Sequence, residues 1–279
     1  MNKSSSKSLN LDHADHFNAA SIMSVYEKFA QFYDLIYKDI VNYSQETDEF
    51  ETLFKRFSKR RPESVLDVGC GTGSHSLLLS KRGYAVMGID ISERMITVAK
   101  NKASKEGLKV DFSVQDMRRL DLGKRFDGAL CAFGGFGYLL TYEDLREFLS
   151  HLKMHLKPDG LFMFEFWNVG GVRPSPLKSW LRVQTGTLVL YRLSESNFDP
   201  LTNVLAIDFH FIELHRKKLA ETFSETHKIR CYTLPEIKKY LEDNGFKLVE
   251  AFDWNARDTK DFKPPEKDSF RILTVARQV

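Results

Sequence analysis

The chain has 279 residues, of which 42% are hydrophobic and 28% charged, a composition typical of a globular protein that buries a large core. Its net charge is only +3, which excludes a general polyanion-binding surface. There is no apolar signal-peptide core at the start and no run of about 18 apolar residues. We therefore expect a cytoplasmic protein with no membrane partner. Cys70, Cys131 and Cys231 are odd in number and lack CxxC spacing, so we expect reduced thiols and neither a disulfide framework nor a zinc site.

The chain begins with a segment rich in Ser and Lys, residues 1–22, which we expect to form a mobile tail. Beyond it, Tyr26, Phe29, Tyr33 and Tyr37 recur at helical spacing. This pattern predicts an amphipathic helix with an unusually aromatic face.

Helices and strands alternate in the next part of the chain. The expected helices cover residues 50–57, 74–83, 92–107 and 143–160, and the expected strands cover 64–68, 84–90, 109–116, 127–133 and 161–167. Strands that alternate with helices of this length predict βαβ units. The predicted fold is a Rossmann-like α/β domain with a doubly wound, mostly parallel sheet.

Two-residue alternation replaces this rhythm between Arg173 and about Cys231. In NVLAIDFHFIEL, alternate residues are apolar and Asp208 and His210 lie on the opposite face, which predicts an antiparallel sheet. A helix over residues 234–245 and two further strands then complete a seven-stranded core sheet, so this antiparallel sheet is an insert between its fifth and last strands. The predicted division is a tail over 1–22, a core over 23–170, the insert over 171–231, and the end of the core over 232–279.

The sequence VLDVGCGTG, residues 65–73, brings glycines to the end of a buried strand. Gly69, Gly71 and Gly73 let the backbone approach a ligand, and the N–H groups at the following helix start favour a negatively charged group. Their GxGxG spacing differs from the GxGxxG of dinucleotide-binding domains. Asp67, two residues before the first glycine, could attract a cation directly or through water.

Two further strands end in acids. Asp90 ends the second strand, where a carboxylate accepts both hydrogen bonds of a ribose diol in dinucleotide-binding folds. Asp116 follows the third strand and could accept from an exocyclic amino group such as that of adenine, with Met117 against the ring. Together these positions predict a nucleoside ligand.

In this order, VLDVGCGTG, GIDIS, QDM and the strand beside LKPDG resemble the motifs of class I S-adenosylmethionine-dependent methyltransferases. The resemblance implies that S-adenosyl-L-methionine is the cofactor. Its methionyl part would lie on the glycine loop, its ribose at the second strand, its adenine at the third, and its methyl group beside the residues after the fourth. The implied cofactor-binding residues are Tyr33, Asp67, Gly69, Cys70, Gly71, Gly73, Asp90, Ile91, Met95, Asp116, Met117, Ala132 and Phe133.

Further stretches resemble the N,N-dimethyltransferases of nucleotide-linked amino sugars, over residues 26–279. They are FAQFYDLIY, GGFGYL, EFW and FSETHKIRCYT, and related small-molecule methyltransferases carry similar ones. KDIVNY keeps only part of the basic and tyrosine pattern of the sugar enzymes. The resemblance implies methyl transfer to a small-molecule acceptor, with an amine, and among amines an amino-sugar nucleotide, favoured.

Tyr33, Tyr138 and Glu165, each at the expected cofactor-facing end of an element, are the candidate catalytic residues. They could orient the acceptor or take its proton, since an alkyl ammonium must lose a proton before its nitrogen attacks. Each tyrosine could equally be a packed aromatic residue, and Glu165 could mark an edge hydrogen bond. Glu225 and His227 share a face of the last insert strand; we interpret them first as a structural pair that could also reach the acceptor.

Histidines provide no predicted metal site. His151 and His155 are four residues apart on a helix, but they lack the glutamate of HExxH and flank Lys153 on a face that we expect to be solvated. His75, after the glycine loop, could contact the cofactor or a backbone carbonyl.

Three other functions remain as alternatives. A nucleic-acid or protein methyltransferase is disfavoured because CAFGG stands where amino-methylating enzymes resemble one another in [DNS]PP[YFW], and because the charge is near neutral, so we expect no nucleic-acid partner. A cofactor-binding scaffold without turnover is compatible with the cofactor motifs. A dinucleotide-dependent oxidoreductase is disfavoured by GxGxG and QDM.

We expect the insert to close over the acceptor or to supply a homodimer surface.

Overall fold

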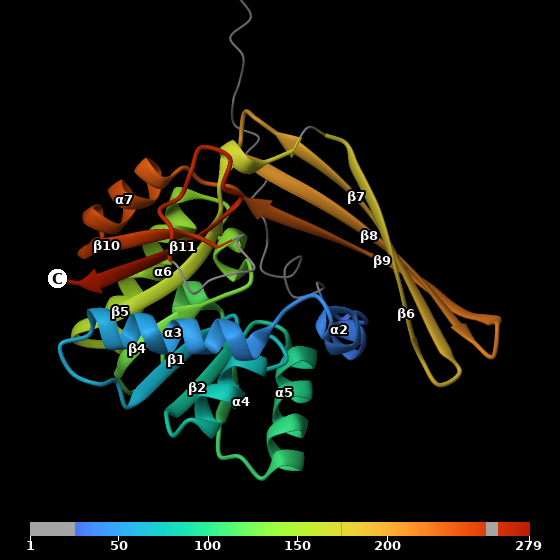
Figure 1. The fold of residues 1–279 in the computed structure, drawn as a ribbon, viewed down its shortest axis with the longest axis horizontal. Helices are drawn as coiled ribbons and strands as arrows, with labels where there is room; N and C mark the ends of the chain where they lie inside the picture. The colour runs from blue at the N-terminus through green and yellow to red at the C-terminus, as the bar shows by residue number, and fades with distance from the viewer. Residues whose placement is uncertain (1–25, 174, 255–261) are drawn as a thin grey trace, which may run out of the picture.

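The computed structural model describes residues 26–173, 175–254 and 262–279, which form two separate β-sheets joined through a single polypeptide (Figure 1). The predicted tail, residues 1–22, lies outside the described residues. Of the described helices, none is long and apolar enough to cross a membrane. All three cysteines are free thiols.

The larger sheet has seven strands in the order β10-β11-β5-β4-β1-β2-β3. Strands β1 to β5 pair in parallel, whereas β11 is antiparallel to both β5 and β10. This topology confirms the predicted doubly wound, mostly parallel core. Its strands are β1 (Ser64–Val68), β2 (Ala85–Asp90), β3 (Asp111–Val114), β4 (Phe126–Cys131), β5 (Leu156–Trp167), β10 (Phe246–Asp253) and β11 (Arg271–Gln278).

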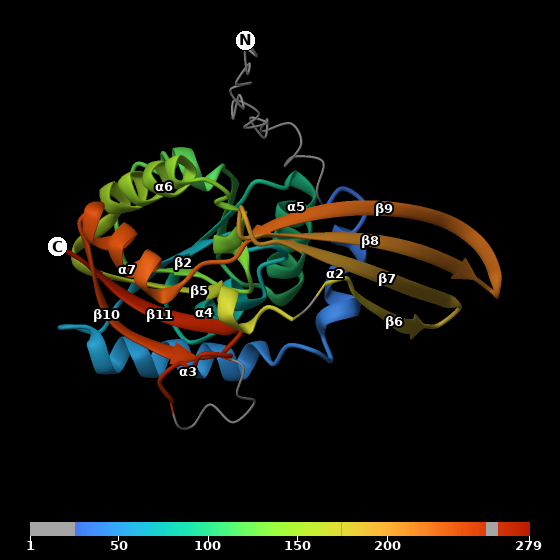
Figure 2. The same cartoon turned by 90° about the horizontal axis from the view of Figure 1, so that it is seen from above.

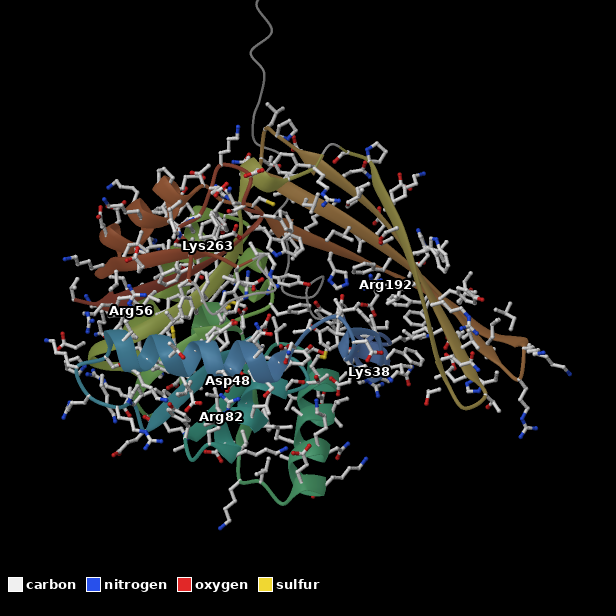
Figure 3. The ribbon with its side chains drawn as sticks, viewed as in Figure 1. Lys38, Asp48, Arg56, Arg82, Arg192 and Lys263 are labelled. Atoms are coloured by element: carbon white, nitrogen blue, oxygen red, sulfur yellow. The ribbon has the colours of Figure 1, made fainter. Side chains whose placement is uncertain are left out.

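Helices cover both faces of this sheet, with α3 on one side and α6 and α7 on the other (Figure 2). The helices are α2 (Ala30–Tyr37), α3 (Tyr43–Phe57), α4 (Ser74–Lys81), α5 (Glu93–Glu106), α6 (Tyr142–His155) and α7 (Leu234–Asp243). Short 3-10 turns are η1 (Met117–Arg119), η2 (Gly135–Tyr138) and η3 (Val169–Gly171). On the α3 side, Arg82 at the end of α4 forms a 2.7 Å ion pair with Asp48 of α3 (Figure 3).

Strand β5 shows why both faces are covered. Its side chains alternate, so Leu161 and Met163 pack with the α3 residues, whereas Phe162 and Phe164 pack with those of α6 and α7. All four are at most 1% exposed. Burying each such side chain contributes about 1.5–3 kcal/mol, so the centre of the sheet anchors the domain.

Capping residues mark several helix ends. The Ser92 side chain accepts from the Met95 N–H at the start of α5, and Gly107 ends this helix in the left-handed conformation. The predicted capping box of Thr233 and Glu236 is present at the start of α7.

Helix α3 begins at Tyr43, earlier than the expected range of 50–57, and several strand ends shift by one or two residues. Two further boundaries differ from the prediction. Helix α2 begins only at Ala30, because Tyr26 has a φ of 68° and the residues after it form a turn. The segment LKPDG belongs to strand β5 instead of ending the preceding helix. Pro158 explains this second difference, since proline disfavours a helical residue before it.

The insert is an antiparallel sheet, as predicted; it has four strands and projects away from the core (Figure 1). It consists of β6 (Leu177–Thr185), β7 (Leu188–Asp199), β8 (Val204–His215) and β9 (Lys218–Arg230). Arg216 and Lys217, both with positive φ, make the expected tight turn between β8 and β9.

Helix α2 lies between the core and the insert (Figure 1). Its buried Phe32 and Ile36, with Phe29 just before it, share a cluster with Leu190 and Phe211 of the insert. In Figure 3, Arg192 of β7 lies beside this helix, where its Nη1 donates a 3.1 Å hydrogen bond to the Tyr37 hydroxyl. One face of the insert is therefore packed on α2.

Candidate active site

The first cavity lies where the parallel strands β1, β2, β3 and β4 end, the usual ligand position in doubly wound sheets. All but one of the predicted cofactor-binding residues line it. They are Tyr33, Asp67, Gly69, Cys70, Gly71, Asp90, Ile91, Met95, Asp116, Met117, Ala132 and Phe133. The strand-end motifs therefore converge on one cavity.

The glycine loop leaves room for a ligand. Gly69 and Gly71 have φ values of 66° and 53°, and a Cβ built on Gly71 would meet no atom within 4 Å. A ligand can thus approach the backbone closely at this point. Gly73, predicted as a cofactor contact, does not line the cavity: its φ is 78°, and a Cβ there would lie 2.8 Å from the Phe112 ring. Close packing explains this glycine.

Asp90 combines burial with two backbone hydrogen bonds. Its Oδ2 accepts from the Gly71 N–H and its Oδ1 from the Ser92 N–H, both at 2.9 Å. Burial raises the pKa of Asp90 to about 6. Each carboxylate oxygen retains a lone pair that can accept from a ligand hydroxyl, which fits the predicted ribose position.

Asp116 has a partner that the sequence analysis missed. The Arg118 Nε lies 3.0 and 3.1 Å from the two Asp116 oxygens, and its Nη1 lies 3.0 Å from Asp144 of α6. Burial alone would raise the pKa of Asp116, but hydrogen bonds from Arg118 lower it. The available signal was the pair of arginines that follows QDM in the sequence.

Buried ionisable groups lie behind the glycine loop. Asp67 is 2% exposed and accepts a 2.6 Å hydrogen bond from the Ser76 hydroxyl, and burial raises its pKa. His75 lines the first cavity, so its expected contact with the cofactor stays a prediction. Its Nε2 lies 2.9 Å from Oε2 of Glu46 on α3, so its hydrogen-bond partner is a carboxylate and not the alternative backbone carbonyl. Burial lowers the pKa of His75, but Glu46 raises it above the usual range.

A second cavity adjoins the first and brings together all three predicted catalytic residues, Tyr33, Tyr138 and Glu165. Tyr26, Tyr33, Phe133 and Tyr138 line both cavities. The remaining residues of the second cavity include Tyr37, Trp167, Ile207, Phe209, His227, Ile229, Phe270 and Arg271. The insert therefore supplies one of its walls.

Tyr138 is the centre of a hydrogen-bonded group in the shared wall. Its hydroxyl lies 2.9 Å from the Tyr26 hydroxyl and 2.6 Å from Nδ1 of His227. Tyr33 packs edge-on against Phe133, with ring centroids 6.4 Å apart. Burial raises the pKa of both Tyr33 and Tyr138, so their hydroxyls stay protonated at neutral pH.

Glu165 is 1% exposed and engaged by a partner that the sequence analysis missed. The Nε of Arg271, on the neighbouring strand β11, lies 3.1 Å from both Glu165 oxygens. The same guanidinium reaches Glu46 at 3.4 Å. The carboxylate of Glu165 is thus held in an ion pair and is not a free base.

Glu225 and His227 lie together on β9, as expected. Glu225 accepts hydrogen bonds from the backbone N–H groups of Tyr26 at 2.9 Å and Phe29 at 3.2 Å. Its Oε2 lies 3.6 Å from Nε2 of His227. The insert thereby holds the chain at the start of α2.

The histidines on α6 have structural partners. His151 and His155 each contact the backbone carbonyl four residues earlier, and His155 Nε2 also accepts from the Leu122 N–H at 3.0 Å. His155 is 6% exposed, so the prediction of a solvated face was wrong at this residue. Within the described residues, no group of three or more His, Cys, Asp or Glu side chains could hold a metal ion.

The sequence and the fold both match known methyltransferases. The family described as a methyltransferase domain matches residues 65–160. A ubiquinone biosynthesis O-methyltransferase of Coxiella burnetii is 30% identical over 167 residues, which cover 50% of this chain and 69% of that protein. A dTDP-3-amino-3,6-dideoxy-alpha-D-glucopyranose N,N-dimethyltransferase of Streptomyces fradiae is 26% identical over 223 residues, which cover 79% of this chain and 84% of that protein.

Among solved structures, an S-adenosylmethionine-dependent methyltransferase from Clostridium acetobutylicum superimposes with a TM-score of 0.76 at 23% identity. The match covers 91% of this chain and 98% of the other, so it includes the insert as well as the core. The strand-end motifs, the sheet order and these similarities agree. The chain therefore belongs to the class I S-adenosylmethionine-dependent methyltransferases.

Proposed function

We propose that the protein methylates a small-molecule amine, which binds in the second cavity while the cofactor binds in the first. The observation that carries this proposal is the wall common to both cavities, made by Tyr26, Tyr33, Phe133 and Tyr138. A methyl group can pass between two ligands only if they meet in line at short range. Cavities that share lining residues are adjacent, so ligands bound in them would lie close to each other.

The residues of the first cavity fit S-adenosylmethionine. The open space above Gly71 suits the methionyl part, and the oxygens of Asp90 suit the ribose hydroxyls. Met95 and Met117 supply apolar surface for the adenine. The cofactor supplies an electrophilic methyl group on a positively charged sulfur. Aromatic rings stabilise a nearby cation, and Tyr33 and Phe133 line both cavities.

The second cavity suits an amine because it combines aromatic walls with a few polar groups. Trp167 and Phe209 exclude water from the acceptor, which strengthens the polar contacts inside. We assign the hydroxyls of Tyr33 and Tyr138 the role of orienting the acceptor nitrogen. We assign Glu165 the role of fixing Arg271 beside the acceptor, because its oxygens are both occupied by that guanidinium.

An amino-sugar nucleotide is the acceptor class that we would test first. The relative from Streptomyces fradiae is named for such a substrate, and its similarity extends over 79% of this chain. The insert would cover the sugar, because its residues Ile207, Phe209 and Ile229 line the second cavity.

Two measurements test the proposal. Calorimetric titration should give binding of S-adenosylmethionine and S-adenosylhomocysteine, with NAD as the negative control. Methyl uptake from labelled S-adenosylmethionine should then occur with amino-sugar nucleotides and not with the same sugars carrying a hydroxyl in place of the amine. Cofactor binding with methylation of hydroxyl acceptors alone would reject the amine assignment.

A further inference from the structure

We propose that His227 receives the proton that the acceptor amine loses, through the hydroxyl of Tyr138, and that Glu225 sets the orientation of the His227 ring. This inference rests on the proposed function. In it, Tyr138 contacts the acceptor and His227 is a positioning and proton-accepting partner.

The geometry of His227 supports a directed hydrogen bond. The residue is 3% exposed, and its ring is enclosed by Tyr26 and Phe209, whose centroids lie 4.9 and 5.1 Å away. Its Nδ1 lies 2.6 Å from the Tyr138 hydroxyl. The imidazole thus has one defined contact on the side of the shared wall.

Glu225 determines which ring nitrogen carries the proton of neutral His227. Its carboxylate lies 3.6 Å from Nε2, and it is fixed by the backbone N–H groups of Tyr26 and Phe29. Among the residues that the structure describes, Nε2 has no hydrogen-bond partner. A neighbouring carboxylate favours the proton on Nε2, which leaves the Nδ1 lone pair to accept from Tyr138.

This arrangement lets Tyr138 pass on a proton without becoming a tyrosinate. Burial raises the pKa of Tyr138, so loss of its proton without replacement is costly. If the hydroxyl proton moves to Nδ1 of His227 while the acceptor ammonium gives a proton to the same oxygen, Tyr138 stays neutral. The resulting imidazolium is stabilised by Glu225.

The step balances. The ammonium loses one proton to Tyr138, and His227 gains the Tyr138 proton. The freed nitrogen lone pair forms the N–C bond, and the electrons of the broken C–S bond stay on sulfur. His227 releases its proton to solvent when the products leave.

Several ionisable groups face His227 and must be separated in the test. Tyr138 of η2 and Tyr26 before α2 approach from other elements, and Glu225 lies on the same strand. Across the second cavity lie Tyr33, Tyr37 and the Glu165–Arg271 pair. Variants at His227 itself are therefore the most direct probes.

The decisive variant is His227→Asn. The asparagine oxygen can take the place of Nδ1 and accept from Tyr138, but it cannot take up a proton. We expect kcat with an amine to fall at least about 100-fold at neutral pH, with cofactor affinity and acceptor KM nearly unchanged. Activity should recover as the pH rises, because the amine then arrives unprotonated.

The matched control is His210→Asn on the adjacent strand β8. His210 is exposed and its Nδ1 contacts Ser224, so this variant should keep full activity. Wild-type kcat and pH dependence in His227→Asn would overturn the proton transfer.

A second readout does not need turnover. In cofactor-free protein with ¹⁵N-labelled histidine, the His227 signals, identified by their loss in His227→Asn, should show a protonated Nε2 and an unprotonated Nδ1. Tyr138→Phe should shift the Nδ1 signal. A proton on Nδ1, or no shift in Tyr138→Phe, would overturn the inference even if amines are methylated. The predicted signals with failure of every amine would instead reject the proposed function.

Discussion

The seven-stranded sheet and the four-stranded insert differ in how they bury their faces. Helices cover both faces of the larger sheet (Figure 2), whereas the insert packs one face on α2. On its remaining surface Trp180 is 70% exposed and Leu193 is 41% exposed. The first cavity, where we propose that the cofactor binds, belongs mainly to the core, while the second cavity has the insert as a wall. Under the proposed function, recognition of the acceptor can therefore vary in the insert without disturbing the core residues proposed to hold the cofactor.

The largest expected effect tests whether the two sheets are separately stable. Phe211 is 1% exposed and stacks on Phe223 at 4.5 Å, so Phe211→Ala should cost about 3–5 kcal/mol of packing between the insert and α2. Hydrogen exchange should show loss of protection in β7 to β9 before the core. The core counterpart Phe164→Ala should lower protection throughout. If both sheets of the Phe211→Ala variant lose protection at the same time, the two sheets form one cooperative unit.

The next largest effect concerns the core alone. Asp90→Ala removes the proposed ribose acceptor and the hydrogen bond that holds the Gly71 N–H. We expect S-adenosylmethionine affinity to fall about 100-fold, or about 2.7 kcal/mol, in a calorimetric titration. The control is Asp111→Ala on β3, which removes the exposed ion-pair partner of Lys124 and should leave the affinity unchanged. Unaltered affinity in folded Asp90→Ala would reject the ribose assignment.

The pH should act on the same carboxylate. Since the pKa of Asp90 is about 6, the ionised form that accepts two hydroxyl hydrogen bonds is lost as the pH falls through 6. We expect cofactor affinity to be about 10-fold weaker at pH 5 than at pH 7, and this difference should disappear in Asp90→Ala. In cofactor-free protein, pH acts on stability in the opposite direction. The pKa is raised from its ordinary value of 3.8, so the stability that Asp90 contributes is present below pH 3.8 and is lost as the pH rises through 6.

A smaller effect should come from the contact between α2 and the glycine loop. The Thr72 hydroxyl donates a 2.6 Å hydrogen bond to Asp34 of α2, which also binds Lys102 of α5 at 2.8 Å. Thr72→Val should weaken cofactor binding about fivefold, by about 1 kcal/mol. Thr97→Val, on the exposed face of α5, should have no effect in the same titration. Equal effects in both variants would show that the contact between Thr72 and α2 does not contribute to cofactor binding.

The smallest expected effect lies on the open surface of the insert. Trp180→Ala should change the free energy of unfolding by no more than about 0.5 kcal/mol in a denaturant titration. A loss of several kcal/mol would mean that this surface is covered in solution.

How much the sequence predicts also differs between the two regions. Gly69, Asp90 and Asp116 are recognisable because each lies at the end of its own strand, and parallel strands bring their ends to one edge. The same rule misjudged Gly73, since spacing does not distinguish a glycine that faces a ligand from one that packs against Phe112.

Apart from Arg118, which lies two residues after Asp116 in QDMRR, the missed residues come from segments far apart in the chain. Glu46 of α3 and Arg271 of β11 meet at 3.4 Å only after the sheet is complete. Tyr26 reaches Tyr138 from a non-helical turn, although its spacing predicted a helical position. Tertiary packing produces these contacts, and no local pattern encodes them.

The carboxylate of Glu225 binds the N–H of Tyr26, a residue 199 positions earlier in the chain. During synthesis, the segment that leads into α2 leaves the ribosome long before this partner exists. Strands β1 to β5 can assemble in the meantime, since domains fold as their residues appear. The wall shared by the two cavities is therefore completed late, only after the final insert strand has been translated.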